Sequence, residues 1–265
     1  MCRHLAYVGP PVPLAELVLD APHGLLRQSW APRDMRGGGT VNADGFGAGW
    51  YPGPGAEPVR YRSARPIWTD VSFAGLAAAV TAGALLAAVR SATVGMPVSE
   101  SAAAPFAEGR WLFSHNGVIR GWPDTMAGPA DELPVTDLLT MDAGTDSALL
   151  WALLRHRLRT GADPAVALVE LVTSVEAAAP NSRLNVLLTD GVTIWATAWD
   201  HALSVHSTGD AALVASEPLD DRAGWSAVPD RHLVVARPGR HECTQIVDAH
   251  VDAHAFDRTA MTGDR

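Results

Sequence analysis

Hydrophobic residues recur at helical intervals in the middle of the chain. Leu150, Leu153, Leu154 and Leu158 fall on one face of a helix, which predicts an amphipathic helix over residues 146–158. The full set of helices that we predict is residues 14–19, 71–82, 146–158 and 164–178. The two long ones are adjacent in the sequence and separate an earlier group of strand-like segments from a later one.

Short apolar runs bounded by turn residues predict strands on both sides of the helices. The predicted strands are residues 3–8, 46–51, 84–89, 111–115, 184–188, 193–199, 211–215, 232–236 and 242–247. The predicted loops are residues 22–44, 91–109 and 123–144. Strands and helices do not alternate regularly, so the pattern favours an α+β fold with antiparallel sheets. We expect one domain over residues 1–265, with a frayed tail over residues 256–265.

The composition is that of a globular protein with no attraction for nucleic acid. The 265 residues are 48% hydrophobic, and the net charge of −9 opposes phosphate binding. The two cysteines form no C-x-x-C pair, which is typical of a reducing compartment. No segment reads as a signal peptide or membrane span. We therefore expect a cytoplasmic protein whose partner is a small molecule, with neither nucleic acid nor membrane as a partner.

Cys2 is the first candidate for chemistry. Removal of Met1 would give a residue that carries a thiol and an α-amine on one carbon. An α-amine has a pKa of about 7.7–8.0, so it can take the thiol proton and return it later. Nucleophile and base would then belong to one residue. The alternative is a cysteine that occupies position 2 by chance.

Asn116 and Gly117 follow a predicted strand in the segment Ser114-His115-Asn116-Gly117. An Asn side-chain amide and the next backbone N–H can donate two hydrogen bonds to an oxyanion. The same dipeptide is also a strong signal for a hairpin turn, which is the favoured interpretation when it is taken alone. Both interpretations can hold at once.

Arg90 and Asp146 are candidates for binding a substrate that carries both a carboxylate and an ammonium group. Arg90 closes an apolar strand and could bind a carboxylate with two hydrogen bonds. Asp146 could bind an ammonium group. The alternatives are an exposed arginine at a strand end and an acid at a helix N-terminus, where Thr145 or Asp146 would be the cap.

Other groups of residues give weaker evidence for a functional site. His241, Cys243, His250 and His254 do not have the spacing of common zinc sites, so we expect no metal. His115 could pair with Cys2 as a Cys–His dyad, although an α-amine base makes this unnecessary.

Five motifs stand in one order along the chain, and together they resemble the class II glutamine amidotransferases, a family of N-terminal nucleophile hydrolases. The motifs are Cys2, residues 42–47, Arg90 with Thr93, residues 115–117 and residues 145–147. The resemblance implies a four-layer αββα sandwich of two antiparallel sheets. It also implies Cys2 as nucleophile and Asn116 with Gly117 as oxyanion hole, and it needs no cofactor. Arg90, Asp146 and Thr93 would hold the glutamyl group.

Three longer segments resemble one branch of that family, which hydrolyses γ-glutamyl-hercynylcysteine sulfoxide in ergothioneine biosynthesis. They are residues 1–14, 25–51 and 90–106, with residues 215–225 as a fourth. Arg3 departs from the Met-Cys-Gly start that is common in the family. The alternatives are a glutaminase that supplies ammonia to a separate synthase, a general γ-glutamyl peptide amidase, and a non-catalytic binding protein. The trimethylammonium of a hercynyl group predicts an aromatic or acidic pocket, for which Trp30 is the candidate.

Overall fold

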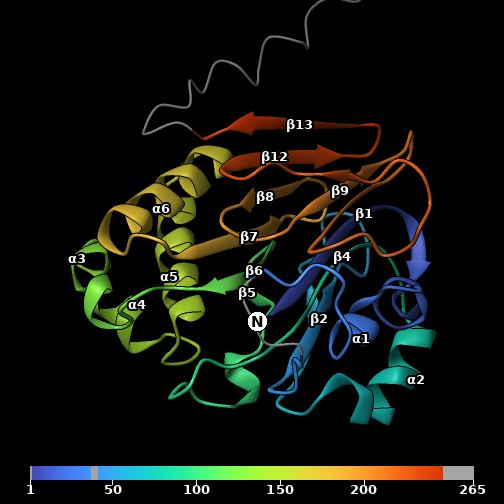
Figure 1. Ribbon diagram of the computed structural model, residues 1–265, viewed down its shortest axis with the longest axis horizontal. Coiled ribbons are helices and arrows are strands. Elements are labelled where there is room, and N and C mark those ends of the chain that lie inside the picture. Colours follow the sequence, from blue (N-terminus) through green and yellow to red (C-terminus); the bar gives the residue numbers. More distant parts are fainter. Residues whose placement is uncertain (1, 37–40, 247–265) are drawn as a thin grey trace, which may run out of the picture.

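Two antiparallel sheets face each other in the computed structural model, which describes residues 2–36 and 41–246 (Figure 1). The seven-stranded sheet has the order β11-β9-β10-β1-β4-β2-β3, and the six-stranded sheet has the order β13-β12-β8-β7-β6-β5. The strands of the first are β1 Arg3–Pro13, β2 Phe46–Trp50, β3 Val59–Ser63, β4 Thr81–Val89, β9 Ser204–Ser207, β10 Ala212–Ala215 and β11 Ser226–Ala227. Those of the second are β5 Phe106–Glu108, β6 Trp111–Val118, β7 Arg183–Thr189, β8 Ile194–Ala198, β12 His232–Arg237 and β13 Arg240–Gln245.

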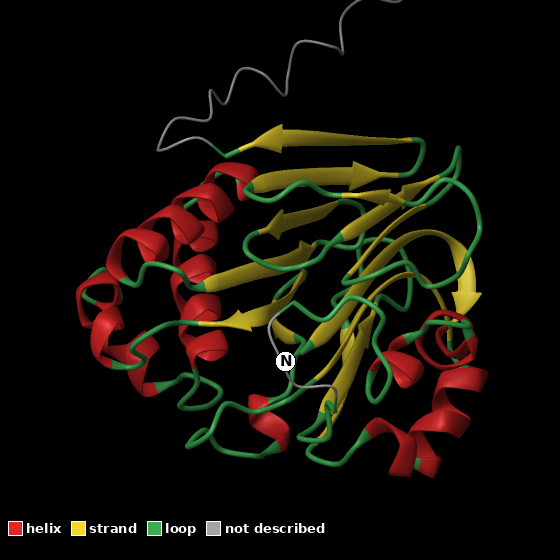
Figure 2. Cartoon of the chain, in the orientation of Figure 1, coloured by secondary structure: helices red, strands yellow, loops and turns green. Residues whose placement is uncertain are grey.

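Helices cover the outer face of each sheet (Figure 2). The α-helices are α1 Leu25–Gln28, α2 Val71–Ala79, α3 Ala127–Ala130, α4 Val135–Leu139, α5 Asp146–Arg159 and α6 Pro164–Ala178. The short segments are η1 Glu16–Asp20, which is π-helical, and the 3₁₀ turns η2 Ile67–Thr69, η3 Glu100–Ala102 and η4 Asp124–Met126. Helices α5 and α6 pack on the six-stranded sheet, whereas η1, α1 and α2 pack on the seven-stranded sheet.

Three apolar clusters hold the four layers together. Residues on one side of β1, such as Leu5, pack towards the helices, whereas Ala6 and Val8 face the other sheet. Between the sheets, these two residues meet side chains such as Leu187 of β7 and Val234 of β12. The predicted αββα sandwich of two antiparallel sheets is therefore confirmed. None of the helices in the described ranges is long and apolar enough to cross a membrane.

The two long helices, α5 and α6, each begin directly after an N-cap residue whose side chain accepts hydrogen bonds from the first turn. The Thr145 hydroxyl accepts a hydrogen bond from the Ala148 N–H, and the Asp163 carboxylate accepts from the N–H groups of Ala165 and Val166. Such caps satisfy N–H groups that have no partner inside the helix. The prediction for these helices is confirmed to within one residue.

Two turn predictions were wrong. Asn116 and Gly117 do not reverse the chain, because they lie inside β6 and pair with Asn185 and Leu184 of β7. The hairpin signal fails here because the pairing partner comes from far along the sequence. The second wrong prediction is that the strand over residues 3–8 ends in a turn at Gly9-Pro10-Pro11. A bulge between Val8 and Val12 accommodates the two prolines, and β1 continues to Pro13.

Several short elements were not predicted. The missed strands are β3, β5, β9 and β11, and the missed helices are α1, α3 and α4. β3 has the sequence VRYRS and an exposed start, so it lacks the apolar run that marks a buried strand. The predicted helix over 71–82 ends at Ala79, since Thr81 already pairs with β1. The predicted tail and the last residue of the predicted strand 242–247 lie outside the described residues.

Candidate active site

Cys2 stands at the entrance to β1, between the two sheets. Its side chain is half-buried, and its Sγ lies 3.9 Å from the carbonyl oxygen of Ser91. His4, two residues further, shares its strand face and lies with Nδ1 3.1 Å from the Ser114 Oγ of β6. The thiol therefore lies where the ends of β1, β4 and β6 converge.

A small cavity surrounds the thiol, and we call it the Cys2 cavity. Its lining residues are Cys2, Ala88, Val89, Arg90, Ala102, Ala104, Phe106, His115 and Ser147. The structure thus brings together Cys2, Arg90 and His115 from three separate parts of the chain. The walls are mostly small or apolar, so the charged group of Arg90 is the main feature that a polar substrate would meet.

The position of Arg90 is fixed by its backbone. Its N–H donates to the Gly45 carbonyl at 2.8 Å, and its carbonyl accepts from the Asp44 N–H at 2.9 Å. The Asp44 carboxylate also accepts from the Ala92 N–H at 2.8 Å, so the predicted turn at residues 42–47 fastens the strand end. The guanidinium donates to the Pro97 carbonyl, and the residue as a whole is only 8% exposed. No carboxylate of residues 2–36 or 41–246 pairs with it, which leaves its charge available to an anionic ligand.

Both ring nitrogens of His115 are already engaged. Nε2 lies 2.9 Å from the Arg183 carbonyl, and Nδ1 lies 3.0 Å from the Ser147 Oγ. A carbonyl oxygen only accepts, so Nε2 carries the proton and Nδ1 accepts from the Ser147 hydroxyl. This arrangement argues against His115 as the base for Cys2 and favours a role in shaping the cavity wall.

Glycine is the only residue type that fits at position 117 in β6. A Cβ built there would lie 1.8 Å from the Arg183 carbonyl oxygen and 2.4 Å from the His115 Nε2. Real Cβ contacts are never that short, so a side chain would force the strands or the imidazole to move. The absence of a side chain at Gly117 is what lets His115 reach the carbonyl of β7.

The side chain of Asn116 is fully buried beside Gly117. Its Nδ2 donates to the Ser216 Oγ at 3.2 Å, while its Oδ1 has no hydrogen-bond partner among the described residues. A 180° rotation of the amide exchanges the two atoms. Ser216 would then donate to Oδ1, and Nδ2 would take the position that lacks a partner. In that orientation the amide offers a donor, as an oxyanion requires.

Asp146 lies at the first turn of α5, and its carboxylate is engaged by backbone. Oδ2 accepts from the Ile119 N–H at 3.2 Å, and Oδ1 accepts from the Ser147 N–H at 2.7 Å. The cap of the helix is Thr145. Asp146 does not line the Cys2 cavity itself, but the next residue, Ser147, does. Each carboxylate oxygen keeps a further lone pair for a ligand.

Thr93 and Trp30, like Asn116, Gly117 and Asp146, do not line the Cys2 cavity. Thr93 is exposed and accepts a hydrogen bond from the Met96 N–H through its backbone. Trp30 is 39% exposed and packs edge-on against Trp68, with ring centroids 5.8 Å apart. The described residues contain no cluster suited to a metal, and two of the four residues weighed for one, His250 and His254, fall outside the described ranges.

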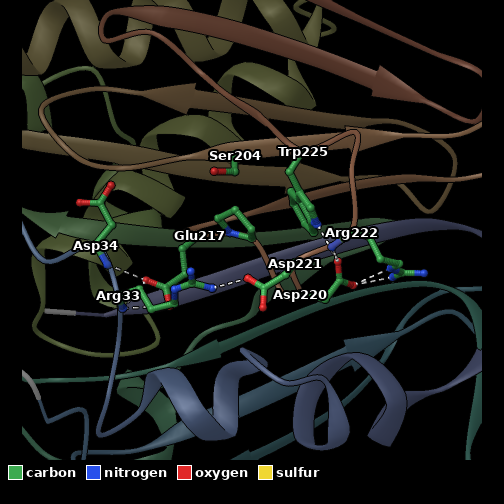
Figure 3. Close-up of a pocket in the computed structure, with 9 residues that line it drawn as sticks. Arg33, Asp34, Ser204, Glu217, Asp220, Asp221, Arg222 and Trp225 are labelled. Atoms are coloured by element: carbon green, nitrogen blue, oxygen red, sulfur yellow. Dashed lines mark hydrogen bonds and ion pairs between the residues drawn. The ribbon is translucent and has the colours of Figure 1, made fainter.

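A second cavity was not predicted from the sequence, and we call it the Trp225 cavity (Figure 3). Its lining residues are Arg33, Asp34, Ser204, Glu217, Pro218, Asp220, Asp221, Arg222 and Trp225. Arg33 pairs with Asp221 at 2.8 Å, and the Trp225 Nε1 donates to Asp220 at 3.1 Å (Figure 3). The hydrogen bond from Arg33 lowers the pKa of Asp221, which is therefore ionised at neutral pH.

Arg3 connects the start of β1 to this second cavity. Its side chain is fully buried, and burial lowers its pKa while the charge of Glu217 opposes that shift. The guanidinium donates to the Asp34 carbonyl, and the Glu217 carboxylate accepts from the N–H groups of Arg33 and Asp34. Two buried opposite charges thus hold the segment that follows Trp30.

Comparison with known proteins agrees with this geometry. The family description "Glutamine amidotransferases class-II" matches residues 20–208. A relative from Mycolicibacterium smegmatis, named gamma-glutamyl-hercynylcysteine sulfoxide hydrolase, is 46% identical over 252 residues, which is 95% of this chain and 98% of the relative. A relative of the same name from Mycobacterium tuberculosis is 46% identical over 234 residues, covering 88% and 92% of the two chains.

Solved structures share the fold at lower sequence identity. A glutamine aminotransferase class-II domain protein from Silicibacter pomeroyi has a TM-score of 0.66 at 22% identity, covering 93% of this chain and all of that one. A glutamine phosphoribosylpyrophosphate amidotransferase from B. subtilis has a TM-score of 0.62 at 15% identity, covering 94% of this chain and 50% of that one. From the family match and the 46% identical relatives, this chain belongs to the class II glutamine amidotransferase family.

Proposed function

We propose that this protein hydrolyses the γ-glutamyl amide bond of γ-glutamyl-hercynylcysteine sulfoxide and releases glutamate and hercynylcysteine sulfoxide. The observation that carries the proposal is the Cys2 thiol in one cavity with the unpaired charge of Arg90. The names of the relatives that are 46% identical over most of the chain support the choice of substrate. No helix in the described part of the chain could span a membrane. The same proposal includes two further expectations: the chain forms one hydrolase domain, and the protein is cytoplasmic.

The glutamyl end of the substrate is the part that the Cys2 cavity recognises. Arg90 binds the α-carboxylate, because its guanidinium is buried and meets no carboxylate of the described chain. Asp146 accepts from the α-ammonium beyond its two backbone donors, and Thr93 assists from the loop after Arg90. Because Arg90 and Asp146 bind the two charged groups at the glutamyl end of the substrate, its γ-carbonyl lies at the Cys2 thiol.

Hydrolysis of the amide bond needs only functional groups of the protein and one water molecule. After removal of Met1, the Cys2 α-amine takes the thiol proton, and the thiolate attacks the γ-carbonyl carbon. The oxyanion accepts from the Asn116 Nδ2 and the Gly117 N–H. The α-ammonium then protonates the departing amine as the C–N bond breaks, which leaves a thioester on Cys2. Water, deprotonated by the α-amine, cleaves the thioester to glutamate and the free thiol.

A glutaminase that serves a separate synthase is the second candidate, since it uses the same residues on a smaller leaving group. Glutamate release from the sulfoxide and from glutamine separates the two functions. We expect a higher kcat/KM for the sulfoxide, and no release by the Cys2→Ala variant with either substrate. A higher kcat/KM for glutamine would replace the proposed function by the glutaminase. Turnover by Cys2→Ala would contradict the mechanism.

A further inference from the structure

The Trp225 cavity has the size and chemistry of a ligand site. It encloses about 340 Å³, within the range of roughly 300–1,000 Å³ that is typical of small-molecule pockets. Four carboxylates, two guanidiniums and one indole line it. Acidic groups therefore exceed basic ones, and the cavity favours a ligand that carries a cation together with a smaller anionic group.

The chain joins this cavity directly to the residues around Cys2. Arg3, the neighbour of Cys2, donates to the backbone carbonyl of Asp34 on the cavity wall. On the other side, the Ser216 hydroxyl accepts from the Asn116 amide, and the next residue, Glu217, lines the cavity. Hydrogen bonds of Arg3 and Asn116 therefore link the wall of this cavity to the residues around Cys2.

A quaternary ammonium cannot donate hydrogen bonds, so proteins hold it with aromatic faces and nearby negative charge. Trp225 is half-buried, and its indole edge is fixed by the hydrogen bond from Nε1 to Asp220. Asp221 is the exposed carboxylate of the same loop, and Arg33 keeps it on the cavity side (Figure 3). We propose that the Trp225 cavity binds the leaving half of the substrate, with its trimethylammonium against Trp225 and Asp221. This inference rests on the proposed function.

Trp30, the candidate from the sequence, lacks these features. It lines neither of the two cavities, and the Arg27 guanidinium already lies 6.0 Å from the centroid of its ring. Trp30 is therefore the matched tryptophan against which Trp225 can be tested.

The test compares kcat/KM for γ-glutamyl-hercynylcysteine sulfoxide with kcat/KM for γ-glutamylcysteine, which has the same amide bond and no hercynyl group. We expect Trp225→Ala and Asp221→Asn each to reduce the ratio of the two values on the order of tenfold, and Trp225→Phe to keep most of it. The controls Trp30→Ala and Asp131→Asn should change the ratio less than about twofold, as distant surface changes do. Equal losses on both substrates, or a larger effect of Trp30→Ala, would overturn the inference and leave the proposed function intact.

Binding of hercynine alone gives a readout that does not depend on turnover. Calorimetry with the Cys2→Ala protein should detect hercynine, and the further change Trp225→Ala should weaken its binding on the order of tenfold. Unchanged affinity would overturn the inference. If hercynine binds as expected while the wild type releases no glutamate from the sulfoxide, the proposed function fails and the cavity assignment holds.

Discussion

Replacement of Gly117 by alanine tests the geometry on which the site is built. The new methyl group would lie 1.8 Å from the Arg183 carbonyl oxygen and 2.4 Å from the His115 Nε2. The shorter contact cannot be relieved by the movement of a side chain, because the Arg183 carbonyl oxygen is backbone of the paired strand β7. The substitution must therefore open the β6–β7 ladder, whether or not His115 also moves.

The expected cost follows from these contacts. Overpacking in a core costs about 1–3 kcal/mol, and two contacts this short place Gly117→Ala at the upper end, near 3 kcal/mol. For a chain of this size each kcal/mol lowers the melting temperature by about 2–4 °C, so we expect a decrease of roughly 6–12 °C. The assay is thermal unfolding followed by circular dichroism or calorimetry.

Gly128 provides the control. A Cβ built there meets nothing within 4 Å, so Gly128→Ala should leave the melting temperature unchanged or slightly raised. Adding His115→Ala to Gly117→Ala removes only the longer of the two short contacts, so it should not restore stability. A Gly117→Ala protein as stable as the Gly128→Ala protein would refute the reasoning.

Three further predictions concern the site and its surroundings. Asn116→Ala should lower kcat on the order of 10²–10³ by removing an oxyanion donor, and a loss below about tenfold would contradict that role. Arg90→Lys keeps the charge but loses the paired donors, so KM for the γ-glutamyl substrate should rise on the order of tenfold, whereas exposed Arg65→Lys should leave it unchanged. Burial lowers the pKa of His201 to about 3, so the folded protein keeps this ring neutral while the unfolded chain protonates it below about pH 6.5. Its contribution to stability is therefore complete above that pH and is lost as the pH falls from about 6.5 towards 3; urea unfolding across this range should show a shallower decline for His201→Phe, and equal declines would count against the assignment.

The sequence predicted those elements whose signals are local. The helices over 146–158 and 164–178 have caps at Thr145 and Asp163 and long apolar faces, so neighbouring residues alone define them. Strand β1 was found for the same reason, although its length was not, because a bulge carries the chain past Pro10 and Pro11. Signals of this kind do not depend on distant parts of the chain.

The remaining features depend on contacts between distant segments. The Asn116-Gly117 pair has the composition of a hairpin turn, but strand β7, more than sixty residues away in the sequence, pairs with it in the sheet. The order of motifs indicated Cys2 and Arg90 through resemblance to a family, and the fold places both in one cavity. The Trp225 cavity joins residues 33–34 to residues 217–225, and no spacing rule connects two such segments. The charges in residues 217–222 were the available signal for it, and they are ambiguous without the fold.

The most direct test of the central claim is to trap the covalent intermediate on the N-terminal cysteine. Wild-type protein mixed with γ-glutamyl-hercynylcysteine sulfoxide is quenched in acid, digested and analysed by mass spectrometry. The chain has one other cysteine, Cys243, which is exposed on β13 and serves as an internal control. The proposed mechanism predicts an N-terminal peptide that begins at Cys2 and carries one glutamyl group, with Cys243 unmodified. Turnover with Met1 retained, or a glutamyl group on Cys243 and none on Cys2, would contradict it.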